Sequence, residues 1–168
     1  GVLKYTTDSL LKQMVLTEMF SHALENNEIN FLEKYKNILD LHIKEPFLKE
    51  PLLEYYNQVF EWYNNPRMAS DAVLKKLEGT SVKQIMDSLF LMNKSKVIYI
   101  DCWATWCGSC LSELPNSKEL MNKLAGKEVS FVYLCIDSDE KAWKAKLAEL
   151  QLGGQHLFLN KQQSGSLR

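Results

Sequence analysis

Apolar positions recur every three or four residues along the first 78 residues, a period that predicts helices. Asp8 and Ser9 are candidate N-caps of the first helix, and Asn26 and Asn27 end it. A shorter helix is expected over residues 71–78, before Gly79. The three longer apolar stripes comprise Leu11, Met14, Val15, Met19, Ala23 and Leu24; Phe31, Leu32, Tyr35, Ile38, Leu39, His42 and Ile43; and Leu52, Leu53, Tyr56, Val59, Phe60 and Tyr63.

The pattern changes in the second half of the chain. Residues 96–101, "KVIYID", and 128–137, "EVSFVYLCID", are short apolar runs rich in β-branched and aromatic residues, which predicts strands buried on both faces. "HLFLN", 156–160, predicts a weaker third strand. Helices are expected over 82–90, over about 107–125 and after a cap at Asp137 or Ser138. The order βαβαβ with short connections predicts parallel strands joined by helical crossovers.

Composition excludes some partners and predicts a packed core. The 20 Lys and Arg residues nearly balance the 21 Asp and Glu, so nothing in the charge favours nucleic acid or an anionic membrane. Hydrophobic residues make up 46% of the chain, enough for a core. No apolar run approaches the ~18 residues of a spanning helix, so membrane anchoring would require a segment not present here. No signal peptide is visible.

Candidate chemistry lies in "DCWATWCGSCLSELP", residues 101–115. Of the four cysteines, only Cys107 and Cys110 have a motif spacing, so we expect one special pair, with Cys102 and Cys135 as buried packing thiols. Cys107 would lie at the start of the helix after the strand, where unpaired N–H groups favour a thiolate. Model thiols titrate near pH ~8.5, and such positions lower the pKa to ~3.5–7.5. Cys110, one turn later, would resolve the mixed disulfide.

Other kinds of site also use closely spaced cysteines. Zinc needs a second ligand pair, and Cys102, Cys135 and His156 are scattered singly. A c-type haem needs a histidine after the second cysteine, where this chain has Leu111. Plain packing without chemistry stays open, but a CxxC motif in a βαβ context favours redox chemistry. We therefore expect no metal and no cofactor.

Asp101 closes a buried strand, where ionisation is costly without partners. Two interpretations are open. In the first, Asp101 reaches solvent or caps a turn; in the second, it is a buried acid of raised pKa that exchanges a proton with Cys110. Strand alternation places Asp101 and Cys102 on opposite faces, so the two are not expected to act together.

The motif "VIYIDCWATWCGSC" resembles the active-site strand and turn of the thioredoxin superfamily, and "WATWC" is especially similar to TlpA-like thiol–disulfide oxidoreductases of bacterial envelopes. The resemblance covers residues 96–160. It implies that Asp101, six residues before Cys107, is the buried proton-transfer acid. It also implies that Pro115 is the proline that kinks the active-site helix. The expected surround of the pair is Thr105, Trp106, Gly108, Ser109 and Pro115.

Two features depart from the family pattern. Ser109 replaces the proline common in thioredoxin itself, so the redox potential is not predicted. The family's cis-proline loop facing the cysteines has no counterpart, since the last proline is Pro115. We therefore expect a thioredoxin-like α/β domain over 79–168, truncated before that loop, after an all-helical region over 1–78. A three-stranded remnant would leave one sheet edge open.

The functional expectation is a thiol–disulfide oxidoreductase acting on protein thiols or disulfides, implied by the resemblance to be reducing and periplasmic or otherwise extracytoplasmic. The alternative is a binding or scaffold module that uses the helical half, with a vestigial thioredoxin-like domain. A thiol peroxidase ranks below both, because Thr105 lies near the pair but no arginine does.

Overall fold

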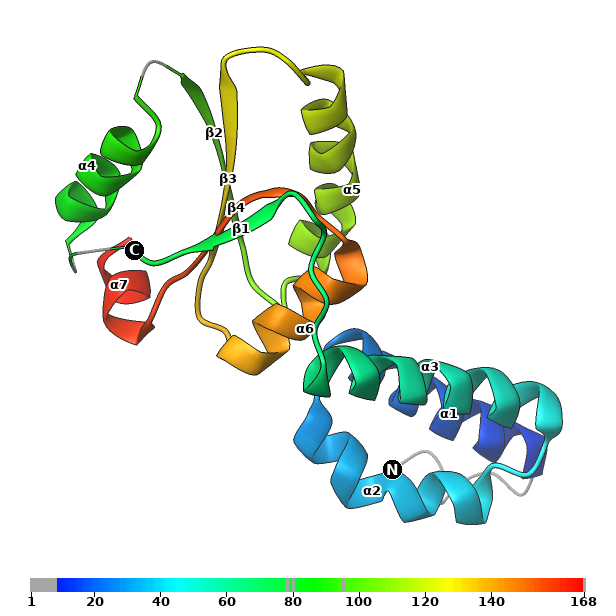
Figure 1. The fold of residues 1–168 in the computed structure, drawn as a ribbon. Coiled ribbons are helices and arrows are strands. Elements are labelled where there is room, and N and C mark those ends of the chain that lie inside the picture. Colours follow the sequence, from blue (N-terminus) through cyan, green and yellow to red (C-terminus); the bar gives the residue numbers. More distant parts are fainter. Residues whose placement is uncertain (1–8, 78, 80, 95, 168) are drawn as a thin grey trace. The chain divides into compact units, whose positions relative to one another are not determined.

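The computed structural model describes residues 9–77, 79, 81–94 and 96–167. The chain divides between Asn65 and Pro66 into a helical unit and a sheet-containing unit (Figure 1). Residues 66–77 thus belong to the sheet-containing unit, whereas the sequence predicted an all-helical region over 1–78. No helix among the described residues is long and apolar enough to cross a membrane.

The helical unit consists of the three longer helices expected from the sequence. Pro46 occupies the first turn of the third helix, where its missing N–H costs nothing. Pro51 lies inside that helix. The candidate cap Asp8 is outside the described residues. The helices are α1 (Ser9–Glu25), α2 (Ile29–His42) and α3 (Pro46–Asn64).

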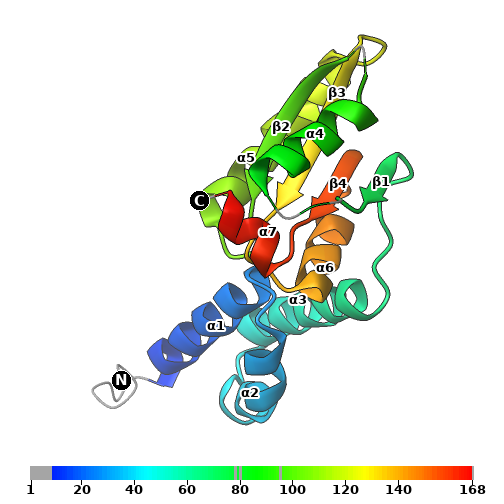
Figure 2. The ribbon, with the colours of Figure 1, turned by 90° about the vertical axis from the view of Figure 1, so that its left-hand side faces the viewer.

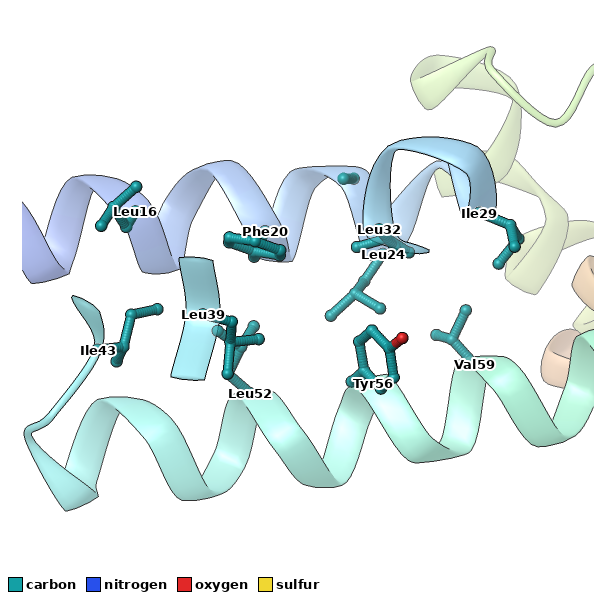
Figure 3. Close-up of a cluster of buried hydrophobic side chains, with 11 residues drawn as sticks. Leu16, Phe20, Leu24, Ile29, Leu32, Leu39, Ile43, Leu52, Tyr56 and Val59 are labelled. Carbon is teal, nitrogen blue, oxygen red and sulfur yellow. The ribbon is translucent and has the colours of Figure 1, made fainter. Parts of the chain in front are cut away.

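One apolar cluster holds the three helices together. Phe20 and Leu24 of α1 and Leu52 and Val59 of α3 point toward each other, with Leu39 of α2 beside them (Figure 3). All five are buried. The stripes at helical spacing therefore form the core of this unit, as predicted.

The sheet-containing unit is a four-stranded, fully parallel sheet with the strand order β1-β4-β3-β2 (Figures 1 and 2). Its chain order confirms the βαβαβ prediction over the second half. A further helix, not predicted, follows β4. The elements are β1 (Ala72–Lys75), α4 (Val82–Met92), β2 (Val97–Trp103), α5 (Gly108–Lys123), β3 (Val129–Cys135), α6 (Glu140–Leu150), β4 (Gly154–Phe158) and α7 (Lys161–Ser166).

The helix predicted over 71–78 is wrong: β1 occupies this segment and pairs with β4. Tertiary pairing overrides the helical propensity of the short segment. The Gly154 N–H donates to the Asp71 carbonyl at 3.2 Å. Gly154 has a φ of +90° and a Cβ there would lie 3.1 Å from the Phe131 carbonyl oxygen, so this close approach favours glycine.

Helices cover both faces of the sheet. On one face, Trp103, Phe131 and Tyr133 pack with residues of α5 and α6. On the other, Val132 and Leu134 pack with Ile85 and Leu89 of α4 and with the segment after β4. Figure 1 shows the sheet nearly edge-on, with α4 and α7 on one side and α5 and α6 on the other. Alternating residues of β3 serve the two cores, as the strand period requires.

The two apolar runs 96–101 and 128–137 differ in burial. β3 lies between β4 and β2 and is buried almost throughout, as predicted. β2 is an edge strand and only half-buried, so the expectation that it is covered on both faces is wrong. Neighbouring strands and helices, which the run itself does not reveal, decide how much of a strand is covered.

We expect Leu89→Ala to destabilise the sheet-containing unit by about 2–5 kcal/mol, because the substitution leaves a cavity under α4. Leu89 is fully buried, whereas Leu91 on the same helix is 65% exposed. Leu91→Ala should therefore change the free energy of unfolding by no more than about 0.5 kcal/mol. Denaturant unfolding of both variants checks the packing of α4, and equal losses would contradict it.

Candidate active site

The site begins where β2 ends and α5 starts. Cys107 is the N-cap of α5, and its Sγ accepts a hydrogen bond from the Cys110 N–H at 3.3 Å. The Cys107 N–H donates to the Ala104 carbonyl at 3.1 Å and closes the turn after β2. The structure thus confirms that Cys107 lies at the start of the helix. A sulfur in this position meets a free backbone N–H and the positive end of the helix dipole.

Cys107 and Cys110 form a disulfide with a Cα–Cα distance of 5.3 Å. Both residues are half-buried. The Cys110 side chain packs against the core beneath α5 and α6, whereas Cys107 is not part of that cluster. One helical turn therefore separates an outer sulfur from an inner one, as the CxxC spacing predicted.

The loop after β3 holds the turn in place. The Thr105 N–H donates to Ser138 Oγ at 3.0 Å, and Trp106 Nε1 donates to the Asp137 carbonyl at 2.8 Å. Thr105 is buried, but 60% of Trp106 is exposed. The Trp106 ring is therefore fixed at one edge and presents apolar surface next to Cys107.

The remaining predicted surround lies in the first turns of α5. A Cβ at Gly108 would meet nothing within 4 Å, so the space beside Cys107 is open. Ser109 Oγ lies 3.6 Å from Cys107 Sγ. Pro115 is inside α5, where it withholds one backbone hydrogen bond from the Leu111 carbonyl. These contacts leave the outer sulfur accessible while the helix supports it.

Asp101 lies on the face of β2 that α5 covers. Burial, the largest cause, raises the pKa of the carboxyl, and the negative charge of Glu113 raises it further. A hydrogen bond from Ser117 opposes these effects. Ser117 Oγ is also 3.0 Å from Tyr133 Oη, in a buried contact. Of the two interpretations of Asp101, the structure favours a partly buried acid over a solvated one.

The other two cysteines differ from each other. Cys135 is buried, as predicted, and burial raises its thiol pKa to about 12, so it is inert near neutral pH. Cys102 was expected to be a buried packing thiol, and this is wrong: it is free and exposed. It lies near the end of the edge strand, on the face opposite Asp101, where coverage is incomplete.

Sequence reasoning missed the groups that brace the site. Ser138 and Asp137 were considered only as helix caps, and Asp139 is in fact the cap of α6. Their position after β3 was a usable signal, because the carboxyl ends of parallel strands lie on the same side of the sheet. Ser117 carries no sequence signal beyond its place two residues after Pro115. Among the described residues, no three His, Cys, Asp or Glu side chains are grouped so that they could hold a metal ion. The same residues contain no cis peptide bond.

Comparisons with known proteins found similarity to thiol–disulfide oxidoreductases and to a thioredoxin. The thiol-disulfide oxidoreductase ResA of Bacillus cereus is 33% identical over 76 residues, which are 45% of this chain and 40% of that protein. Thioredoxin of Coprinus comatus is 35% identical over 48 residues, 29% of this chain and 45% of that protein. A solution structure of a candidate thiol-disulfide oxidoreductase from Bacteroides vulgatus shares 48% identity, covers 42% of this chain and 46% of its own, and has a TM-score of 0.39.

The chain thus spans less than half the length of each of these relatives. A model of one protein family covers a larger part of it. The family described as Redoxin, whose domain is thioredoxin-like, matches residues 75–163, from the end of β1 into α7. This range contains the disulfide, Asp101 and the bracing loop after β3. The chain therefore belongs to the Redoxin family.

Proposed function

We propose that the protein is a thiol–disulfide oxidoreductase that exchanges electrons with protein disulfides through Cys107 and Cys110. The observation that carries this proposal is the disulfide at the start of α5, in which Cys107 Sγ accepts a backbone hydrogen bond. A hydrogen bond donated to a thiolate favours the charged form and so lowers the pKa of the thiol. In the reduced protein this contact therefore favours the Cys107 thiolate, which is the reactive form.

In the reducing direction, the Cys107 thiolate attacks one sulfur of the substrate disulfide. A bond forms between Cys107 and that sulfur, and the other substrate sulfur leaves as a thiolate. Cys110 then loses its proton and attacks Cys107. The Cys107–Cys110 disulfide forms, and the second substrate sulfur is released. The substrate gains two electrons and the protein loses two, so a dithiol reductant must restore the reduced pair.

Asp101 is the proposed acceptor of the Cys110 proton. The raised pKa of the Asp101 carboxyl means that its carboxylate binds a proton more strongly than an ordinary carboxylate does. The pKa of the carboxyl is therefore closer to that of a thiol, which favours proton transfer between them. Ser117 and Tyr133 are positioning groups, since their contact lies beside the carboxyl on the α5 face of the sheet. Asp101 carries out the transfer directly or through a water molecule.

The substrate class, direction and compartment follow from the resemblance to the TlpA-like proteins. Protein disulfides are the proposed substrates, reduction the proposed direction and an extracytoplasmic space the proposed location. The exposed Trp106 ring and the open space at Gly108 support a polypeptide substrate, since both leave room at the outer sulfur. The Cys107–Cys110 disulfide argues against the scaffold alternative, because a vestigial pair has no reason to keep bonding geometry.

Cysteine variants test the assigned order of attack. With a disulfide-bonded peptide as substrate, Cys110→Ser should accumulate a mixed disulfide that mass spectrometry detects, because the resolving thiol is gone. Cys107→Ser should form none and reduce disulfides only at the rate of uncatalysed exchange. Cys102→Ser, which removes the other exposed thiol, should retain activity. A mixed disulfide in Cys107→Ser would refute the assignment.

Asp101→Asn tests the proton step. Losing a general acid–base should slow resolution of the mixed disulfide by about 10² or more. Attack by Cys107 should change little, because Asp101 takes no part in it. Stopped-flow measurement of both steps separates them, and an equal effect on each would contradict the role.

The same variant tests the raised pKa of the Asp101 carboxyl. The native state binds this proton more tightly than the unfolded state, so the wild type loses stability as pH rises from the unfolded pKa through the folded one. Asp101→Asn lacks this titration. At neutral pH the oxidised variant should be more stable than the wild type, and the difference should shrink as pH falls through the raised pKa. A wild type that gains stability over the variant as pH rises would contradict the burial argument.

A further inference from the structure

A second concave site lies outside the carboxyl ends of β1 and β4. It has a volume of about 310 Å³ and is lined by residues of β1 and the segment after it, the first turns of α6, and the junction of β4 and α7. In parallel α/β sheets this is the edge at which ligands bind. The volume is at the lower end of the range for small-molecule pockets, which matches a compact ligand.

The pocket is separate from the disulfide. The cysteines follow β2, at one edge of the sheet, and the pocket follows β4 and β1, at the other edge. None of the residues proposed for disulfide exchange lines it. Its ligand is therefore not the scissile disulfide.

The interior of the pocket is apolar and aromatic. Trp143 of α6 and Phe158 at the end of β4 line it, with ring centroids 5.4 Å apart. Leu74 and Leu77 contribute aliphatic surface, and Leu74 is 40% exposed. A ligand with an aromatic or branched aliphatic body would bury this surface.

The charged groups of the pocket are mostly lysines. Lys75, Lys76 and Lys144 line it together with one acid, Glu140. Glu140 is already paired with Lys144 at 2.7 Å. The ammonium groups of Lys75 and Lys76 have no carboxylate partner among the described residues. The positive excess favours an anion.

The amide side chains that line the pocket are already engaged. Asn160 Oδ1 accepts from the N–H groups of Gln162 and Gln163. The side chain of Gln163 accepts from the Asn160 N–H and donates to the carbonyls of Leu77 and Gly79. These residues shape the wall and leave few hydrogen bonds for a ligand.

The groups left without partners are all donors. Trp143 is 3% exposed, and its Nε1–H is buried with no acceptor among the described residues. Burying such a donor unpaired costs about 1–3 kcal/mol. Because this N–H is shielded even from water, it places no demand on a ligand. The two lysines favour a ligand that brings negative charge.

We propose that this pocket binds a small organic acid, with an aromatic or branched aliphatic body between Trp143 and Leu74 and a carboxylate at Lys75 and Lys76. The aromatic walls select the body of the ligand, and the lysines select its charge. The inference does not depend on the proposed redox function.

Titration of the oxidised protein with phenylacetate tests the site by NMR of the indole N–H groups. The Trp143 signal, assigned by substitution, should shift and saturate, while the signals of the other three tryptophans stay unchanged. Phenylacetamide, which has the same shape without the charge, should bind at least roughly threefold more weakly. No saturable shift at Trp143, or equal binding of the amide, would overturn the proposal.

Lysine variants provide the matched comparison. Lys75→Gln combined with Lys76→Gln should weaken phenylacetate binding at least roughly threefold. Lys94→Gln combined with Lys127→Gln removes the same charge from exposed positions outside the pocket and should have no such effect. Equal weakening by both pairs would overturn the site.

A peptide ending in phenylalanine tests whether the ligand is a free acid or the carboxyl end of a polypeptide. Tighter binding of the peptide than of phenylacetate would overturn the assignment to a small molecule.

Discussion

The site depends on one hydrogen bond, from the Cys110 N–H to Cys107 Sγ at the start of α5. It makes a sulfur the cap of a helix, in the place where Ser, Thr, Asp or Asn usually stands. The same contact sets the spacing of the pair, because the residue that donates the hydrogen bond also carries the second sulfur. Anion stabilisation and disulfide geometry thus have a common origin in the first turn of one helix.

The parallel pairing of β2 with β3 places this helix start where other groups can support it. Trp103 and Cys135 are register partners at the ends of the two strands. The loops that follow therefore lie side by side, and Ser138 and Asp137 hold the backbone of Thr105 and the indole of Trp106. Hydrogen bonds to the loop after β3 therefore hold the active-site turn at the end of β2.

Much of this arrangement could be predicted from the sequence, for reasons that differ between elements. The second apolar run, over β3, was placed correctly because a central strand meets apolar neighbours on both faces. The spacing of Cys107 and Cys110 is local, so it gave the helix start and the disulfide. Asp101 and Cys102 were correctly predicted to lie on opposite faces of the strand, because strand alternation needs no knowledge of the partner strands.

The failures concern contacts between segments that are distant in sequence. β1 was predicted as a helix, since only its pairing with β4 makes it a strand. Cys102 was predicted to be buried, but β2 is an edge strand and the end of its outer face is uncovered. The pocket at β1 and β4 could not be foreseen either. Its aromatic walls and its lysines come from β1, the segment after it, α6 and β4, and none of these forms a motif alone.

The pKa of the Cys107 thiol in the reduced protein tests the central claim most directly. The Cys102→Ser, Cys110→Ser double variant removes the competing thiols but keeps the N–H of residue 110, and the rate of alkylation of Cys107 against pH gives the pKa. The account predicts a value clearly below the ~8.5 of an unperturbed thiol. A value at or above ~8.5 would show that the helix start does not stabilise the thiolate, and the proposed nucleophile would lose its physical basis.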